Sequence, residues 1–295
     1  MPKFNIKEYQ AEITNKVIDS LQTTKSWSAT FCMMSGLPKS MSTGKNYRGI
    51  NVWILSLAGY NSNLWGTFKS WKSAGGCVNK GEKSTKIIFY KPIFKKNDKG
   101  EEELVSFTHR VFSVFNREQV NISDEDLKKY EEEKNLDYSA KPTGKLMDYF
   151  NDVDSPSLTV GSPSYNPRTD VIKLPSGFLN EESAISVAAH EIVHSTGAKN
   201  RLNRDGVAKF DRFGSHQYSK EELVAELGSM FICSELGVST SSTVENSEAY
   251  IQSWVKKLSD HPTMIFNAAS EASKATDYIM NIINNTNTNK GQIAA

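Results

Sequence analysis

The stretch His190-Glu191-Ile192-Val193-His194 constrains this chain more than any other. Residues four apart lie on one face of an α-helix, so both imidazoles can bind a single metal ion. The glutamate between them can hold a water molecule bound to that metal. Two of the five histidines of the chain fall in this stretch. The pattern therefore predicts a metal site, in preference to a helix that carries two histidines by chance.

The surrounding residues predict where this helix lies. Asn180 can cap its start, and Gly197 follows its expected end. Apolar residues recur on one face: Ile185, Ala188, Ala189, Ile192 and Val193. A helix with such a face is buried enough to form the wall of a site.

A catalytic zinc site uses three protein ligands and leaves one position open. Glu222, on a further helix predicted over 219–234, is the preferred third ligand. Glu226 lies one turn later, and we expect it to fix a ligand histidine by accepting its outer N–H group. His216 and His261 are weaker candidates for the third ligand.

A second interpretation of Glu222 stays open at this point. Ser219 and Glu222 have the spacing of a capping box, in which Glu222 would bond back to the backbone of Ser219. Glu226 would then be the metal ligand. Glu221 is expected to face solvent.

The predicted chemistry is the activation of water for peptide-bond hydrolysis. The metal would lower the pKa of its bound water, and Glu191 would take the proton and pass it to the leaving amine. The strand that ends at Leu174 could pair with an extended substrate backbone. Tyr218 is a candidate donor to the developing oxyanion, although a buried structural role is favoured for it.

The net charge of +1 hides an uneven distribution of charge. Residues 41–96 contain ten Lys or Arg and one acid, which gives +9, whereas residues 97–154 contain fifteen acids and eight basic residues. Such asymmetry indicates an anionic partner, and nucleic acid is the first candidate.

The basic window also contains the aromatic side chains that single-stranded DNA requires, because lysines can follow the phosphates while aromatic rings stack on unpaired bases. The candidate DNA-binding residues are Arg48, Trp53, Tyr60, Trp65, Lys69, Trp71, Lys72, Lys80, Lys83 and Lys86. The alternative for the aromatic residues is packing inside a small domain, because residues 65, 68 and 71 share one face of a predicted helix.

The overall pattern predicts an α+β protein of two domains. A small mixed domain over 1–125 would contain helices at 6–22, 51–57 and 61–74 and a β-hairpin formed by 84–94 and 104–115, with Pro92 on an edge or at a bulge. A charged linker over 126–143 and a mostly helical domain over 144–283 would follow, and the tail, 284–295, has too little apolar content to fold.

Two absences suggest a cytoplasmic protein without a membrane partner. No run of eighteen apolar residues occurs, and the first ten residues lack the apolar stretch of a signal peptide. The three cysteines are far apart and fit reduced thiols.

Taken together, these motifs resemble ArdC-type antirestriction proteins over most of residues 1–235. The stretches that resemble the N-terminal domain of that family are 47–51 (YRGIN), 59–62 (GYNS), 67–71 (TFKSW), 80–83 (KGEK) and 89–92 (FYKP). Those that resemble its metallopeptidase-like domain are 190–197 (HEIVHSTG), 201–202 (RL) and 221–228 (EELVAELG). One departure is the sequence at 27–30 (WSAT), where the family leads us to expect a Pro-Trp element.

The resemblance implies a protein of a mobile genetic element that binds single-stranded DNA and protects incoming DNA from restriction endonucleases. It also implies a zincin-like domain that holds zinc or another divalent metal. Restriction endonucleases or other DNA-bound proteins would be further partners. Two alternatives remain: a DNA-associated zinc protease, or a plasmid replication or primase accessory protein whose metal site is unused.

Overall fold

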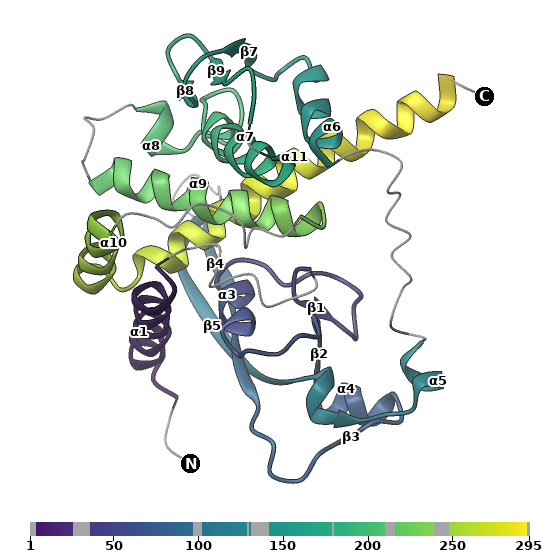
Figure 1. The fold of residues 1–295 in the computed structure, drawn as a ribbon. Helices are drawn as coiled ribbons and strands as arrows, with labels where there is room; N and C mark the ends of the chain where they lie inside the picture. Colours follow the sequence, from purple (N-terminus) through teal and green to yellow (C-terminus); the bar gives the residue numbers. More distant parts are fainter. Residues whose placement is uncertain are drawn as a thin grey trace. The chain divides into compact units, whose positions relative to one another are not determined.

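In the computed structural model, the described residues are 4–25, 36–96, 102–128, 130, 142–178, 180–209, 216–238 and 248–293. They form two compact units (Figure 1). We call Pro38–Lys134 the sheet unit, and Met1–Leu37 together with Asn135–Ala295 the helical unit. The predicted α+β class with two domains is confirmed.

The sheet unit is built on a four-stranded sheet with the order β1-β2-β5-β4. Its strands are β1 (Lys39–Ser40), β2 (Leu64–Thr67), β4 (Thr85–Lys96) and β5 (Glu102–Asn116). Short elements surround the sheet: α3 (Ile50–Ser56), α4 (Phe68–Ser73), β3 (Cys77–Val78), η1 (Arg117–Gln119), β6 (Val120–Asn121) and α5 (Asp124–Leu127).

Two hydrophobic clusters cover the two faces of this sheet. Successive residues of a strand point to opposite faces, so the neighbours Leu64 and Trp65 enter different clusters. Leu64 packs with Trp71 of α4, whereas Trp65 packs with Leu55 of α3 and with Val114. The sheet is therefore the middle layer between α3 and α4.

The helix expected over 61–74 is wrong in its first half, because Leu64–Thr67 forms β2 and the helix α4 begins only at Phe68. Thr67 caps α4 by accepting a hydrogen bond from the N–H of Ser70 at 3.1 Å. A Cβ atom at Gly66 would lie 2.4 Å from the sulfur of Met41, so the strand passes close to a neighbouring segment. Such tertiary contacts stabilise a strand here, although the spacing of the aromatic residues fits a helix.

The predicted β-hairpin is confirmed as β4 and β5, which pair antiparallel. Asn51 of α3 exchanges two hydrogen bonds with the backbone of Ile88, at 2.7 and 2.9 Å, and so covers part of the outer edge of β4. Pro92 lies on this edge strand, and the register shifts between Ile93 and Phe94, as a proline in a strand predicts.

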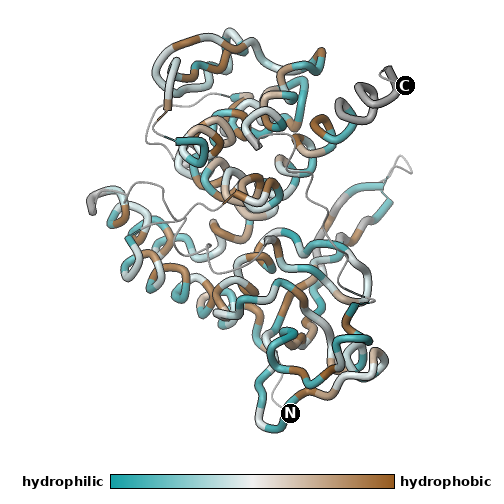
Figure 2. The backbone as a smooth tube through the Cα atoms, turned by 45° about the vertical axis from the view of Figure 1, so that its right-hand side comes forward, coloured by the Kyte–Doolittle hydropathy of each residue, from teal (hydrophilic) through white to brown (hydrophobic). Residues whose placement is uncertain are grey.

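The core of the helical unit is formed by α7 (Glu181–Thr196), α9 (His216–Glu235) and α11 (Met264–Ile293). Helix α9 packs on both α7 and α11. The remaining helices are α1 (Ile6–Thr24), α6 (Pro142–Met147), η2 (Asp148–Asn151), α8 (Asp205–Ala208) and α10 (Glu248–Asp260). Hydrophobic residues recur at intervals along these helices (Figure 2), as expected for helices that bury one face.

A small sheet with the order β7-β9-β8 lies beside α7 (Figure 1). Its strands are β7 (Ser157–Val160), β8 (Ser164–Asn166) and β9 (Val171–Leu174). The strand that ends at Leu174 is the middle one, so both of its edges are already paired. The prediction that it pairs with a substrate is therefore wrong, and β7 and β8 provide the edges.

The compact units differ from the expected domain limits at both ends of the chain. Helix α1 belongs to the helical unit, where it packs on α10 and Thr14 donates a hydrogen bond to the backbone carbonyl of Pro262 at 2.7 Å. Helix α11 continues to Ile293 through the segment expected to be disordered, because a helix that has already formed extends at little cost. The stretch 27–30 and most of the expected linker lie outside the described residues. Within the described part, no helix is long and apolar enough to cross a membrane.

Candidate metal centre

The two motif histidines lie near the C-terminal end of α7. Asn180 caps this helix by accepting a hydrogen bond from the N–H of Ser183 at 2.8 Å, and the helix ends at Thr196, before Gly197. These limits agree with the prediction. His190 and His194 are one turn apart, with 22% and 13% of their side chains exposed, so both remain accessible to a small ligand.

Helix α9 brings Glu222 to these histidines. It begins at His216, so Ser219 lies inside the helix and is not its N-cap. The capping-box interpretation of Glu222 is therefore wrong, and its carboxylate is available to face α7. A Cβ atom at Gly228 would lie 2.8 Å from Cγ2 of Val193, so the glycine permits the close approach of the two helices.

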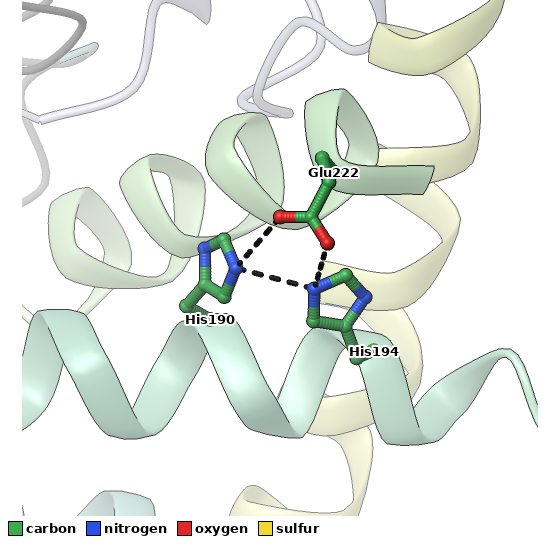
Figure 3. Close-up of side chains that lie close together, drawn as sticks. All are labelled: His190, His194 and Glu222. Atoms are coloured by element: carbon green, nitrogen blue, oxygen red, sulfur yellow. Dashed lines mark hydrogen bonds and ion pairs between the residues drawn. The ribbon is translucent and has the colours of Figure 1, made fainter. Parts of the chain in front are cut away.

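His190, His194 and Glu222 converge on one point between α7 and α9 (Figure 3). The Nε2 atoms of the two histidines are 3.2 Å apart. The Glu222 carboxylate oxygens lie 3.6 Å from Nε2 of His190 and 3.5 Å from Nε2 of His194. Within the described ranges, this is the one group of three His, Cys, Asp or Glu residues that could hold a metal ion.

The donor set fits a divalent metal. Four ligands at about 2.0–2.1 Å from a tetrahedral ion are separated from one another by about 3.3–3.4 Å. The three measured separations, 3.2, 3.5 and 3.6 Å, are close to that value. Two imidazole nitrogens and one carboxylate are also a common donor set of zinc sites that keep an open position. Of the other two histidine candidates, His261 is exposed and does not belong to the group, whereas the side chain of His216 lies outside the described part of the chain.

Glu191 is buried on the same turn as the two histidines, with 8% of the residue exposed. Burial raises the pKa of its carboxyl group, while the neighbouring histidines act in the opposite direction. The backbone of Tyr165, on the edge strand β8, donates a hydrogen bond to this carboxylate. A carboxylate with a raised pKa, held beside a metal site, is suited to accept a proton from water.

Glu221 has the role that we had predicted for Glu226, which is to fix a ligand histidine. Its carboxylate lies 3.4 Å from Nδ1 of His194 and receives two hydrogen bonds from Arg204, at 2.6 and 3.0 Å. Only 5% of Glu221 is exposed, so the prediction that it faces solvent is wrong. A carboxylate on the outer nitrogen of a ligand histidine fixes its tautomer and ring orientation.

Arg204 joins this carboxylate to the end of α7. Its guanidinium also donates to the backbone carbonyl of Val193 and to the hydroxyl of Thr196, both at 2.7 Å. Burial alone would lower the pKa of His194, but the hydrogen bonds to Glu221 and Glu222 raise it to about 10. The two glutamates therefore hold this ring in place by charge.

Glu226 accepts a hydrogen bond from the hydroxyl of Tyr250 at 2.6 Å and is not the partner of a motif histidine. Burial and the charges of Glu226 and Glu222 raise the pKa of this tyrosine. The second carboxylate of the predicted pair thus ties α10 to α9. The side chain of Tyr218, the other tyrosine considered, lies outside the description.

The sequence contained a signal for Glu221 that helical spacing alone missed. Residues 223–233 (LVAELGSMFIC) contain one charged residue, Glu226, and the structure buries the others. A helix that is apolar all round is surrounded by other elements, so a polar residue on any of its faces should be expected to find a partner. No comparable signal pointed to Arg204, which lies just before the short helix α8.

The predicted DNA contacts divide into two groups. Trp53, Trp65 and Trp71 have no exposed surface, and the indole of Trp71 donates to the backbone carbonyl of Phe115 at 3.0 Å. The prediction that these rings stack on bases is therefore wrong: Trp65 and Trp71 lie in the clusters on the two faces of the sheet, and Trp53 is buried on α3. Tyr60 is half-buried against Trp65, with ring centroids 5.5 Å apart.

The basic candidates are all exposed on the sheet unit, where they lie on helices, strands and the loops between them. They are Arg48, Lys69, Lys72, Lys80, Lys83 and Lys86. Their contact with DNA remains a prediction.

The comparisons with known families match the chain in two ranges, of which the first also includes α1. Residues 7–135 match the family described as the N-terminal domain of anti-restriction factor ArdC. Residues 157–271 match the family described as zincin-like metallopeptidase, and this range contains the whole donor group.

Among solved structures, the chain is similar to the antirestriction protein ArdC from the R388 plasmid in its metal-free form. The sequence identity is 30%, the TM-score is 0.71, and the match covers 96% of this chain and 99% of that one. The Mn(II)-bound structure of the same protein matches with a TM-score of 0.69 over 95% of this chain.

Among curated proteins, the chain is 32% identical to an Escherichia coli DNA primase TraC over 83% of its own length, but it spans only 18% of that protein. A second TraC is 31% identical, and the chain spans 27% of it. The uncharacterized protein y4eC of Sinorhizobium fredii is 29% identical over 82% of this chain and 80% of that protein.

Proposed function

The chain belongs to the ArdC family of antirestriction proteins, and from this premise we propose that it binds single-stranded DNA and protects incoming DNA of a mobile genetic element from restriction endonucleases. The observation that carries the proposal is the likeness to the R388 protein over nearly the full length of both chains. The primase activity named for TraC is not part of it, because the chain spans less than a third of those proteins.

The charge of the sheet unit supports DNA as the partner. Its basic window places exposed lysines on α4, on the loop before β4 and on β4 itself. Phosphate contacts from such side chains release counterions and attract nucleic acid irrespective of sequence. Protection in this proposal is steric, because a strand covered by protein is not accessible to an endonuclease.

For the metal centre we propose zinc, held by His190, His194 and Glu222. A bound zinc ion would supply a Lewis acid that polarises a carbonyl group and acidifies water. Glu191 would accept and return the proton, Glu221 would hold the ring of His194, and Arg204 would hold Glu221. The contacts by which Glu221 holds His194 and Arg204 holds Glu221 lie within the chain and do not depend on a bound metal ion.

The buried Glu191 also favours a second candidate function, the hydrolysis of peptide bonds in DNA-bound proteins, of which a restriction endonuclease is one class. A site that serves only structure does not need a proton acceptor beside its ligands. With this second function, the protein would protect DNA by hydrolysing the restriction endonuclease.

One experiment separates the two functions. A host that carries a restriction system receives DNA as a single strand while it expresses the full chain, its Glu191→Gln variant or its Lys69→Glu/Lys72→Glu variant, and the transfer efficiency is measured relative to a host without restriction. Steric protection predicts full activity for Glu191→Gln and a loss for the lysine variant. Loss with Glu191→Gln alone would show that hydrolysis is required. No protection by the wild-type chain would refute the proposed function.

A further inference from the structure

Among the described residues, the hairpin exposes three aromatic rings that we had not predicted as DNA contacts: Phe89, Tyr90 and Phe112. Phe89 on β4 is 47% exposed and Phe112 on β5 is 41% exposed. Their ring centroids are 5.4 Å apart, with the rings edge to face. With Trp53, Trp65 and Trp71 buried, these two rings are the better candidates for contact with an unpaired base.

The strand register places both rings on the face of the sheet that α3 covers. Ile87 pairs with Phe112, and residues that pair directly across an antiparallel ladder share a face. Ile87 and Val114 are buried in the cluster with Leu55 of α3. Phe89 follows Ile87 by two residues, so the same face continues beyond the part that α3 covers and becomes exposed at the two phenylalanines.

Positive charge accompanies the rings on this face. Arg110 pairs directly with Phe89, and Lys91 pairs with Thr108, so neither cation has an acid as its cross-strand partner. Both side chains are exposed. The two acids of β5, Glu102 and Glu103, are at the far end of the hairpin, opposite Lys96 and Lys95.

We propose that Phe89, Lys91, Arg110 and Phe112, which we call the hairpin face, form the stacking surface for single-stranded DNA. Bases stack on the two rings, and the two cations bind the phosphates between them. Aromatic faces beside cations are the combination that binds single strands without regard to sequence. The inference rests on the proposed function, because that function names single-stranded DNA as the partner.

The charge favours DNA over a protein as the occupant, because phosphate requires cations and both cations of this face lack an acid as cross-strand partner. A duplex would offer its bases only at the groove edges, where ring faces cannot stack on them. Two other described rings of the sheet unit are exposed: Tyr90 of β4, 43% exposed, which points to the opposite face of the hairpin from Phe89, and Phe68 of α4, 55% exposed. Phe68 is a single ring that contacts Phe115 edge-on at 6.4 Å, so it provides a smaller platform and serves as the matched comparison.

The test uses the full chain and a fluorescently labelled oligothymidylate, with affinity measured by anisotropy over a range of salt concentrations. Phe89→Leu/Phe112→Leu keeps the apolar character of the face but removes the rings, so we expect at least fivefold weaker binding, on the order of the loss of one stacked base, with an unchanged salt slope. Lys91→Gln/Arg110→Gln should instead reduce the slope of log affinity against log salt by about 1.4, or 0.7 for each lost phosphate contact. Phe68→Leu should bind like the wild type.

Several outcomes would overturn the proposal. Wild-type affinity in Phe89→Leu/Phe112→Leu would remove the hairpin face as the stacking surface while leaving DNA binding intact. A loss in Phe68→Leu instead would move the platform to α4. A shift of the phenylalanine variant from dimer to monomer in size-exclusion chromatography, without a change in affinity, would show a self-association surface. Failure of the wild-type chain to bind the oligonucleotide would refute the proposed function together with this inference.

A measurement on the unaltered protein makes the result independent of whether the variants fold. Oligonucleotides that contain bromodeoxyuridine are cross-linked to the wild-type chain by light, and the adducts are located by mass spectrometry. We expect adducts at Phe89 or Phe112. Adducts confined to Phe68 or Tyr60 would contradict the hairpin face.

Discussion

The metal centre of the helical unit and the hairpin face of the sheet unit hold their functional side chains in opposite ways. At the metal centre every donor is partly buried, and Glu221 and Arg204 behind it are almost fully buried and bonded to each other. On the hairpin face the rings and cations stand exposed on an edge strand and its neighbour. Metal coordination tolerates only tenths of an ångström of displacement, whereas stacking and phosphate contact tolerate far more.

This contrast predicts how substitutions should act in the two units. In the helical unit a change in one side chain should propagate, because the donors share their supports. In the sheet unit the effects of exposed residues that do not contact one another should be nearly independent and should add, whereas the touching rings of Phe89 and Phe112 should be coupled. Each prediction below tests one side of this comparison.

The largest effect is expected at the third ligand. Glu222→Ala should abolish stoichiometric metal binding, as should His190→Ala or His194→Ala, because two remaining donors do not retain a divalent ion against dialysis. Glu226→Ala should keep the metal, since its carboxylate bonds Tyr250. The metal content per chain after dialysis shows whether Glu222 or Glu226 is the third ligand. Retention of metal by Glu222→Ala and loss by Glu226→Ala would reverse the assignment.

The next effect concerns the support behind His194. Arg204→Ala removes one of the two partners of the buried Glu221 and leaves the contact with His194, so it should lower the free energy of unfolding of the metal-free protein by about 3 kcal/mol, the low end of the cost of breaking a buried ion pair. Denaturant unfolding in the presence of a chelator measures this change.

Two controls test the cause of that loss. Arg168→Ala alters an exposed arginine of the same unit and should stay within about 0.5 kcal/mol of the wild type. Arg204→Leu/Glu221→Leu removes both charges and should regain part of the stability. Equal losses in Arg204→Ala and the double variant would show that packing, and not charge, is responsible.

A smaller effect is expected where α9 crosses α7. Gly228→Ala places a methyl group 2.8 Å from Cγ2 of Val193, and the resulting overpacking should cost about 1–3 kcal/mol. The shift of α9 should also weaken metal binding, because Glu222 moves with the helix. Gly228→Ala/Val193→Ala restores the space and should recover both properties. Recovery of stability without recovery of metal affinity would mean that the crossing does not position Glu222.

The sequence predicted much of the metal centre because helical periodicity acts over short distances. Residues four apart placed His190 and His194 together, whereas Glu222 on the following helix was preferred as the third ligand with Glu226 left open as the alternative. The helix start was harder to locate: with α9 beginning at His216, Ser219 is internal and Glu221 turns inward. Capping signals are local, whereas this helix start depends on packing between helices.

The sheet unit was predicted less well because its secondary structure and surface depend on contacts between residues far apart in the chain. The spacing of Trp65, Phe68 and Trp71 fits a helix, but Gly66 lies against Met41, and the chain there forms a strand. Similarly, alternation along β4 does not show that α3 covers Ile87 and leaves Phe89 exposed. Which aromatic residues remain on the surface follows from the arrangement of helices over the sheet.

The smallest effect per residue is expected for the lysines of α4. Lys69→Glu/Lys72→Glu should weaken binding to single-stranded DNA and reduce its salt slope by about 1.4 if both lysines contact phosphates, while stability stays nearly unchanged because both side chains are exposed. Lys199→Glu/Lys209→Glu makes the same change of charge on exposed residues of the helical unit. It should alter affinity little, because it changes the net charge by the same amount without removing a proposed phosphate contact. Equal weakening in both variants would mean that net charge alone drives binding, and the sheet unit would then have no distinct DNA surface to set against the metal centre.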